Sequence, residues 1–242
     1  VLVEDSTCLK LPALLYSYFG GNTNQKGDYA QARIQVRLEL GTEKIQHIEV
    51  KTYGENDLSF AGQILKNICK GDLIIRDLGY FVIDIFEQIQ DLGAYFISRW
   101  NPICKFVCPN SLKPIDLGEL LRQSQQKGIE MLDLNLLLGL KKQFMVRVVA
   151  LKVPQEVEDK RRAKVEKKKN AIRHYSQAYF EHLGWSIYIT NIPCTMLKAT
   201  QIWHIYRLRW RIEIIFKAWK SHLNIVNCLK DKNCLNPCQI II

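Results

Sequence analysis

A stretch near the C-terminal end of the chain carries one acid, three cations and one phenol at the spacing of a helix face. At about 100° per residue, an arc of about 80° holds the side chains of Tyr206, Arg209, Glu213, Lys217 and Lys220. Such a face could hold a metal-bound phosphodiester, with Glu213 on the metal and the cations on phosphate oxygens. The alternative is a solvated helix face, stabilised by Arg209/Glu213 and Glu213/Lys217 pairs that are each worth roughly 0.2–0.5 kcal/mol.

The neighbouring arc of the same helix is apolar and is predicted to face a core. It is formed by Ile205, Leu208, Ile212, Ile215 and Trp219. We therefore expect one long helix over residues 200–223, buried along one side and charged along the other.

Two aspartates follow apolar segments that read as strands, so both are candidates to meet Glu213. Asp5 ends the strand-like start of the chain, with Asp5–Thr7 as the strand exit, and Asp77 ends a short buried strand over residues 72–77. Two aspartates and one glutamate would suffice as protein ligands for two Mg²⁺ ions, and Mn²⁺ could replace them. The alternatives are an Asx turn or cap at Asp5 and a turn acid at Asp77.

The remaining elements alternate between strands and helices in the first part of the chain. A hairpin is predicted from residues 31–40 and 45–50, and a helix from residues 57–69 with Asp57 as its N-cap. A helical run follows Asp77 and reaches Ile89. Further strands are predicted over residues 94–99, 105–108, 131–138, 144–153 and 185–190.

A polar stretch over residues 156–173 carries eight basic and four acidic side chains and is expected to form a helix with few core contacts. It could contact a DNA backbone, or it could be a solvated charged helix. The predicted organisation is a core in two parts, residues 1–92 and 181–226. A mainly β insertion with the basic helix, residues 93–180, separates them, and residues 227–242 form a C-terminal tail.

Composition favours a polyanionic partner, such as nucleic acid or an anionic membrane surface. The 242 residues carry a net charge of +10 with a pI of about 9.2. No apolar run is long enough to span a bilayer and no signal peptide is visible. The eight cysteines are scattered, so reduced thiols in a cytoplasmic protein are expected rather than structural zinc. Because Val1 stands where a start methionine would, the chain is expected to be a fragment.

The spacing of Tyr206, Arg209, Glu213 and Lys220 fits the pattern Y-x₂-R-x₃-E-x₆-K at every position. This pattern resembles the signature of the bacterial insertion-sequence DDE transposases of the IS-four type. Asp5-Ser-Thr7 and Asp77-Leu-Gly-Tyr-Phe81 are similar to the first and second acidic motifs of that family. Thr190-Asn191-Ile192 is similar to the stretch before its glutamate, so the resemblance covers essentially the whole chain.

The resemblance implies a fold, a site and a reaction. The fold would be α/β, with a ribonuclease H-like core (a mixed sheet flanked by helices) interrupted between its fourth and fifth strands by a mainly β insertion. Asp5, Asp77 and Glu213 would be the metal-binding catalytic triad. Tyr206, Arg209 and Lys220 would contact phosphates near a transposon end, and Lys217 joins them from its place on the helix face.

The implied activity is cut-and-paste DNA transposition: metal-dependent cleavage at insertion-sequence ends, hairpin formation and resolution, and strand transfer to target DNA. The partners would be double-stranded DNA and, in the full-length protein, a second copy in a homodimer. The protein would act in the bacterial cytoplasm, at the nucleoid when bound to DNA.

Two other functions remain open from the sequence. One is a ribonuclease H-like nuclease that uses the same triad without strand transfer. The other is a truncated, inactive remnant that only binds DNA. The family flips a base onto an aromatic side chain of the insertion. The candidates by location are Tyr95, Phe96 and Trp100, and the alternative for each is a core aromatic.

Overall fold

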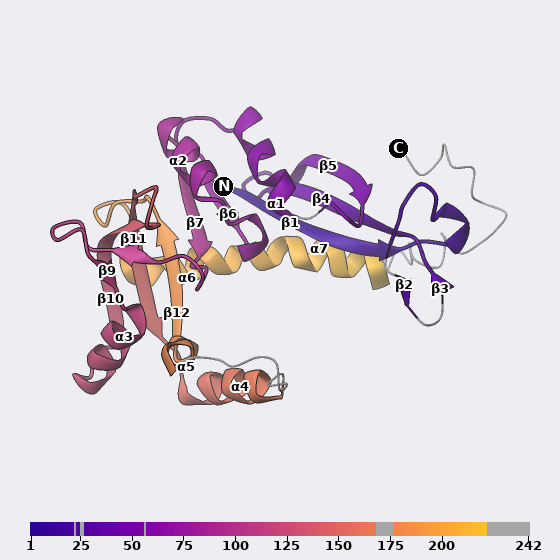
Figure 1. Cartoon of the computed structure of the whole chain (residues 1–242). Coiled ribbons are helices and arrows are strands. Elements are labelled where there is room, and N and C mark those ends of the chain that lie inside the picture. Colours follow the sequence, from indigo (N-terminus) through magenta and orange to yellow (C-terminus); the bar gives the residue numbers. More distant parts are fainter. Residues whose placement is uncertain (22, 25–26, 56, 168–176, 222–242) are drawn as a thin grey trace. The chain divides into compact units, whose positions relative to one another are not determined.

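The computed structural model describes residues 1–21, 23–24, 27–55, 57–167 and 177–221 (Figure 1). The chain divides into two compact units. The first comprises Val1–Val82 together with the segment that starts at Ile205, and the second comprises Ile83–His204. The first unit is therefore built from two pieces of chain that are far apart in the sequence, and the candidate site residues all belong to it.

Four strands form the sheet of the first unit. They are β1 (Leu2–Lys10), β4 (Gln31–Glu39), β5 (Lys44–Thr52) and β6 (Leu73–Arg76), and they lie in the order β5-β4-β1-β6. β1, β4 and β5 form an antiparallel meander, and β6 runs parallel to β1 on its other side. The predicted hairpin is confirmed, and the sheet is mixed, as predicted for a ribonuclease H-like core.

The first strand is longer than predicted. Asp5–Thr7 is not the strand exit, because β1 remains paired with β4 through Lys10, opposite Gln31. The prediction was wrong because three consecutive polar residues, Asp5–Thr7, are typical of the end of a strand. They are tolerated within the strand because they are hydrogen-bonded or line a pocket.

The segments that connect or follow these strands contain short turns of helix and one small ribbon. They are η1 (Ala13–Leu15), α1 (Asp57–Phe60), η2 (Ala61–Lys66) and η3 (Leu78–Tyr80), and the two-residue strands β2 (Thr23–Asn24) and β3 (Gly27–Asp28) form a small ribbon. The helix predicted over residues 57–69 is one α-helical turn followed by 3₁₀ structure that ends at Lys66. The carboxylate of Asp57 accepts hydrogen bonds from β1 and β4 side chains.

The long C-terminal helix is interrupted once. α6 (Ala199–Tyr206) passes through a 3₁₀ turn, η4 (Arg207–Arg209), into α7 (Trp210–Ser221), which packs along β1 (Figure 1). The predicted end at Leu223 lies outside the described residues. A 3₁₀ turn advances by 3.0 residues rather than 3.6, which shifts the phase of the helix face. Leu208, which was predicted to face the core, is accordingly 38% exposed, whereas Phe216 is buried.

The second unit is an antiparallel sheet covered by short helices. Its strands are β7 (Tyr95–Arg99), β8 (Phe106–Val107), β9 (Pro114–Ile115), β10 (Met131–Leu138), β11 (Phe144–Lys152) and β12 (Trp185–Thr190), in the order β7-β12-β11-β10-β8-β9. Every described pairing within this set is antiparallel. Its helices are α2 (Ile83–Asp91), α3 (Leu117–Gln126), α4 (Gln155–Glu166) and α5 (Gln177–Leu183), followed by most of α6.

The predicted α/β class is confirmed, and the segment between the two parts of the core is rich in β structure. The helices α3 and α5 were not predicted. The basic run forms a helix as far as Glu166, and residues 168–173 lie outside the described part of the chain. The division into residues 1–92, 93–180, 181–226 and 227–242 stays a prediction. None of the described helices is long and apolar enough to cross a bilayer.

Candidate active site

The sheet register places Asp5 beside Asp77. The last parallel pair between β1 and β6 joins Glu4 to Arg76, and the residue that follows each of them in the chain is one of the two aspartates. Asp77 continues in an extended conformation, with φ −83° and ψ 170°, before the chain turns into η3. Because successive side chains of a strand point to opposite faces, both aspartates lie on the face opposite Glu4 and Arg76.

α7 supplies the other wall of the site. One pocket is lined by Asp5, Ser6, Thr7, Asp77, Arg209, Glu213, Phe216, Lys217, Lys220 and Ser221. Three carboxylates and three cations therefore face the same space. The structure brings together six of the seven predicted site residues in this pocket, and the seventh, Tyr206, reaches Asp77 through a long hydrogen bond of 3.4 Å from its hydroxyl to Oδ1.

Arg209 holds the centre of this pocket. Its Nη1 donates to Asp5 Oδ2 at 2.7 Å, and its Nη2 lies 2.6 Å from Glu213 Oε1. The Arg209 side chain is only 10% exposed, and its buried Nε has no hydrogen-bond partner among the described residues. A guanidinium thus bridges a strand carboxylate and a helix carboxylate, and its Nε–H has no acceptor among the described residues.

The donor set fits a divalent metal, whereas its present spacing does not. Two aspartates and one glutamate are hard oxygen ligands of the kind that Mg²⁺ and Mn²⁺ prefer. Within the described residues, however, no three His, Cys, Asp or Glu side chains are grouped closely enough to hold a metal ion. Arg209 stands between Asp5 and Glu213, so its guanidinium is the counter-charge of these two carboxylates.

Burial raises the pKa of Asp5 from 3.8 to about 6. Burial is the largest cause, and the nearby carboxylates of Asp77 and Glu213 act in the same direction. The Ser6 backbone N–H and the Arg209 guanidinium oppose the shift by favouring the ionised form. For Arg209 itself, burial would lower the pKa, but Tyr206, Asp77, Asp5 and Glu213 outweigh it and raise the pKa.

We expect the pKa of Asp5 to appear in the pH dependence of stability. The folded protein holds this proton more tightly than the unfolded chain, so stability falls as the pH rises from about 4 to about 6. The loss amounts to up to about 3 kcal/mol for a shift of about two units. Asp5→Asn should abolish it, and the check is urea unfolding of both proteins in EDTA between pH 4 and 8. Parallel pH profiles for the two proteins would contradict the assignment.

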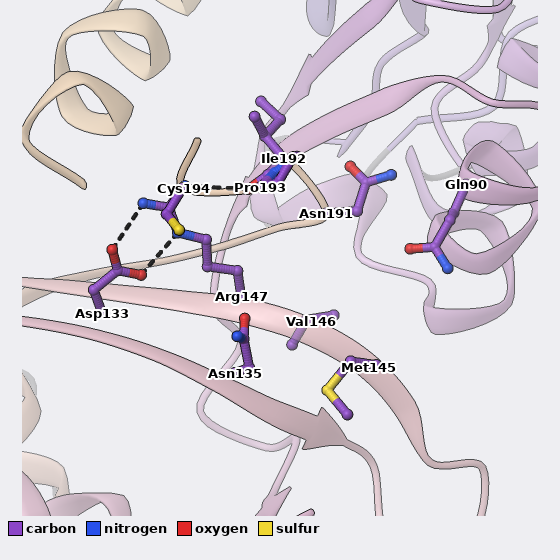
Figure 2. Close-up of a pocket in the computed structure, with 10 residues that line it drawn as sticks. All are labelled: Gln90, Asp133, Asn135, Met145, Val146, Arg147, Asn191, Ile192, Pro193 and Cys194. Carbon is purple, nitrogen blue, oxygen red and sulfur yellow. Dashed lines mark hydrogen bonds and ion pairs between the residues drawn. The ribbon is translucent and has the colours of Figure 1, made fainter. Parts of the chain in front are cut away.

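A second pocket lies in the β-rich unit (Figure 2). It is lined by Gln90, Asp133, Asn135, Met145, Val146, Arg147, Asn191, Ile192, Pro193 and Cys194. Figure 2 shows the Arg147 guanidinium facing the Asp133 carboxylate, and the two N–O distances are 2.7 and 2.8 Å. Arg147 Nη1 also donates to the carbonyls of Ile192 and Leu197. Arg147 therefore anchors the loop that leads from β12 to α6.

Removing this anchor should destabilise the second unit. Arg147→Met leaves the Asp133 carboxylate and two carbonyls without their donor, at a cost of about 3 kcal/mol in the free energy of unfolding. The matched control is Arg122→Met, since Arg122 pairs with Glu119 on an exposed helix surface and should matter little. Equal effects of the two substitutions in urea unfolding would contradict the role given to Arg147.

Two of the aromatic candidates for base stacking are buried. Phe96 is 0% exposed and stacks on Phe86 at 4.5 Å, and Trp100 is 6% exposed and stacks on Phe106 at 5.6 Å. Their surroundings are those of core aromatics. Phe216 and Thr7 also line the pocket, and neither was predicted as a site residue. The available signals were that Phe216 is an apolar residue next to Lys217 and that Thr7 lies two residues after Asp5.

Several known proteins are similar to this chain over most of its length. A family model described as "Transposase DDE domain" matches residues 1–233. The transposase for insertion sequence element IS231F of Bacillus thuringiensis subsp. israelensis is 31% identical over 261 residues, covering 99% of the chain and 53% of that protein. The transposase for insertion sequence element IS1151 of Clostridium perfringens is 27% identical, covering 96% of the chain and 52% of that protein. The chain spans about half the length of the curated relatives it matches.

Proposed function

Because the chain belongs to the family of insertion-sequence transposases with a DDE domain, we propose that it is the catalytic domain of a DNA transposase. The observation that carries the proposal is a pocket in which Asp5, Asp77 and Glu213 face three cations. The two aspartates come from adjacent strands and the glutamate from a helix packed against β1. Convergence of three acids from separate elements is not needed for a fold of this kind and suits metal-dependent chemistry.

The proposed ligands of two Mg²⁺ ions, or of Mn²⁺ in their place, are Asp5, Asp77 and Glu213. Bound divalent ions would activate the attacking oxygen and stabilise the leaving oxygen of a phosphodiester. The aspartates sit on the rigid sheet, where the register sets their separation. Glu213 sits on α7, and its side chain is 33% exposed, so it faces both the aspartates and the open side of the pocket.

The cations of the pocket are the proposed phosphate contacts. Lys217 and Lys220 are exposed on the same side of α7, one and two turns beyond Glu213. Arg209 offers a planar fork of donors, one of which is unused, and this geometry matches the oxygens of a phosphate. Tyr206 lies against the guanidinium of Arg209, at 5.9 Å from ring centroid to Cζ, and holds its orientation.

The proposed reaction is cleavage at the ends of an insertion sequence followed by transfer of the freed strand to target DNA. The substrates would be double-stranded terminal repeats and target DNA, and the full-length protein would act as a homodimer. Since its substrate is chromosomal DNA, the protein would work in the bacterial cytoplasm at the nucleoid. The net charge of +10 favours such a polyanion.

One observation favours a second candidate, a module that binds DNA without cutting it. Arg209 forms ion pairs with both Asp5 and Glu213, and no described group of acids is spaced for a metal. A site that kept this arrangement on DNA would hold phosphates through its lysines and remain inactive.

The test is cleavage of a labelled duplex that carries the terminal sequences of the element, in Mg²⁺, in Mn²⁺ and in EDTA, with a full-length relative as positive control. We expect metal-dependent nicking followed by joining of the nicked strand to a second duplex. Nicking without joining would identify a nuclease. Binding without nicking, under conditions in which the relative cuts, would contradict the proposal and support the inactive module.

A further inference from the structure

A buried cluster of three charges lies directly behind the candidate active site. Arg37 Nε donates to Glu4 Oε1 at 2.9 Å, and Arg76 donates to Glu4 Oε2 from Nε at 2.9 Å and from Nη2 at 2.7 Å. The exposed fractions are 7% for Glu4, 2% for Arg37 and 0% for Arg76. One carboxylate is thus held between two guanidinium groups inside the first unit.

A contribution to the stability of the fold does not by itself explain why these three charges are buried. Burial of three charges carries a desolvation cost that ion pairing often fails to recover, and well-packed apolar replacements are frequently as stable. The pairing is also incomplete, because the cluster holds two positive charges against one negative. Nη1 of Arg37 and Nη1 of Arg76 are buried with no hydrogen-bond partner among the described residues.

The positions of the three residues in the sheet suggest a different role. Glu4 is the direct cross-strand partner of Arg37 on β4 and of Arg76 on β6, so the cluster spans three adjacent strands at one level. The next residues of β1 and of the β6 segment are Asp5 and Asp77. A slip of one residue would turn these aspartates to the opposite face of the sheet. The ion pairs across the strands oppose such a slip, because a slip would move Glu4 away from Arg37 and Arg76.

A second set of contacts ties the following residues to the same face. Ser6 Oγ donates to Asp57 Oδ1 at 2.5 Å, and Gln35 Nε2 donates to the same oxygen at 2.9 Å. Asp57 also lies against Gly79, where a Cβ atom would be 2.7 Å from Asp57 Oδ2, so only glycine fits this close approach without a shift. The Tyr80 hydroxyl donates to Gln35 Oε1. The turn that follows Asp77 is thereby held to β4.

From these contacts we infer that Glu4, Arg37 and Arg76 are positioning residues, which set the separation of the Asp5 and Asp77 carboxylates from the opposite face of the sheet. The inference rests on the proposed function, because the separation matters only if the two carboxylates share metal ions. The residues act through the register and touch neither metal nor DNA. Their loss should therefore weaken metal binding even in a protein that remains folded.

The experiment measures Mn²⁺ affinity of the 242-residue chain by electron paramagnetic resonance, which reads binding without requiring activity. Arg76→Met removes one arm of the cluster, and a triple variant with Glu4→Leu, Arg37→Met and Arg76→Met removes all its charges while keeping an apolar interior. We expect about tenfold weaker Mn²⁺ binding in both, as is typical when the groups that orient metal ligands are removed. Thermal unfolding is recorded for each variant, and the triple variant should remain folded.

Arg147→Met is the matched control, because it breaks a buried ion pair in the other compact unit. It should lower the unfolding temperature and leave Mn²⁺ affinity unchanged. Wild-type affinity in the folded triple variant would overturn the inference, because packing alone would then hold the register. Asp5→Asn separates this failure from that of the proposed function. If Asp5→Asn binds Mn²⁺ as wild type does, Asp5 is not part of a metal site. The proposed metal site is then wrong, and the inference falls with it.

Discussion

Replacing Asp5 or Asp77 by asparagine, or Glu213 by glutamine, is expected to lower DNA cleavage by about a thousandfold or more. Each amide keeps the volume of the carboxylate and loses its charge, and a neutral amide is a weak ligand for a hard divalent cation. DNA affinity should stay within about threefold, since Lys217 and Lys220 remain on the exposed side of the pocket. The measurement pairs the nicking rate with a binding isotherm at one salt concentration.

The control for this series is Glu43→Gln. Glu43 forms an ion pair with Arg211 of α7, so its loss also removes a carboxylate that contacts this helix, but outside the pocket. Cleavage by Glu43→Gln should match wild type. A triad variant that keeps its full cleavage rate would remove that residue from the proposed triad, and inactivity of Glu43→Gln would show that any disturbance of α7 is sufficient.

Substitution of Arg209 by methionine is expected to move metal affinity and DNA affinity in opposite directions. Without the guanidinium, Asp5 and Glu213 lose the cation that bridges them, so Mn²⁺ should bind about tenfold more tightly. Binding to DNA should weaken by about tenfold, and the salt dependence of that binding should lose about one unit of slope. Metal titrations without DNA and DNA titrations in EDTA separate the two effects.

Arg207→Met is the comparison for this substitution, because Arg207 is exposed on the same 3₁₀ turn and does not line the pocket. It should leave Mn²⁺ affinity unchanged and affect DNA binding less than Arg209→Met does. An unchanged Mn²⁺ affinity in Arg209→Met would contradict the competition between guanidinium and metal. Equal losses of DNA affinity would contradict the distinction between the two faces of the helix.

The periodicity of the sequence was sufficient to predict the charged face of α7. Helical spacing depends on local geometry alone, so Glu213, Lys217 and Lys220 could be assigned to one side without knowledge of the fold. The same holds for the predicted hairpin and for the strands β10 and β12, whose ends match the prediction. The interruption at residues 207–209 could not be predicted, and it is the reason that Leu208 faces solvent.

The partners of the site residues could not be predicted, because they depend on contacts between distant segments. Asp5–Thr7 has the composition of a strand end. That β1 continues to Lys10 is seen only from its pairing with β4, which extends to Gln31 opposite Lys10. Arg209 was predicted to contact phosphate, and its ion pair with Asp5 depends on how α7 packs along β1. Glu4 and Arg76 stand beside the two aspartates in the sequence. Nothing in that adjacency indicates that they pair with each other across the strands.

The assembly of the first unit from two distant pieces of chain has a consequence for timing. Arg209 lies 204 residues after Asp5, so a ribosome that adds about 5–20 residues per second reaches Arg209 about 10–40 s after it adds Asp5. During that interval the second compact unit, residues 83–204, is synthesised in full. Asp5 and Asp77 therefore remain without their counter-charge during this interval, and a nascent chain lacks both the helix carboxylate and the cations of the pocket until synthesis reaches α7.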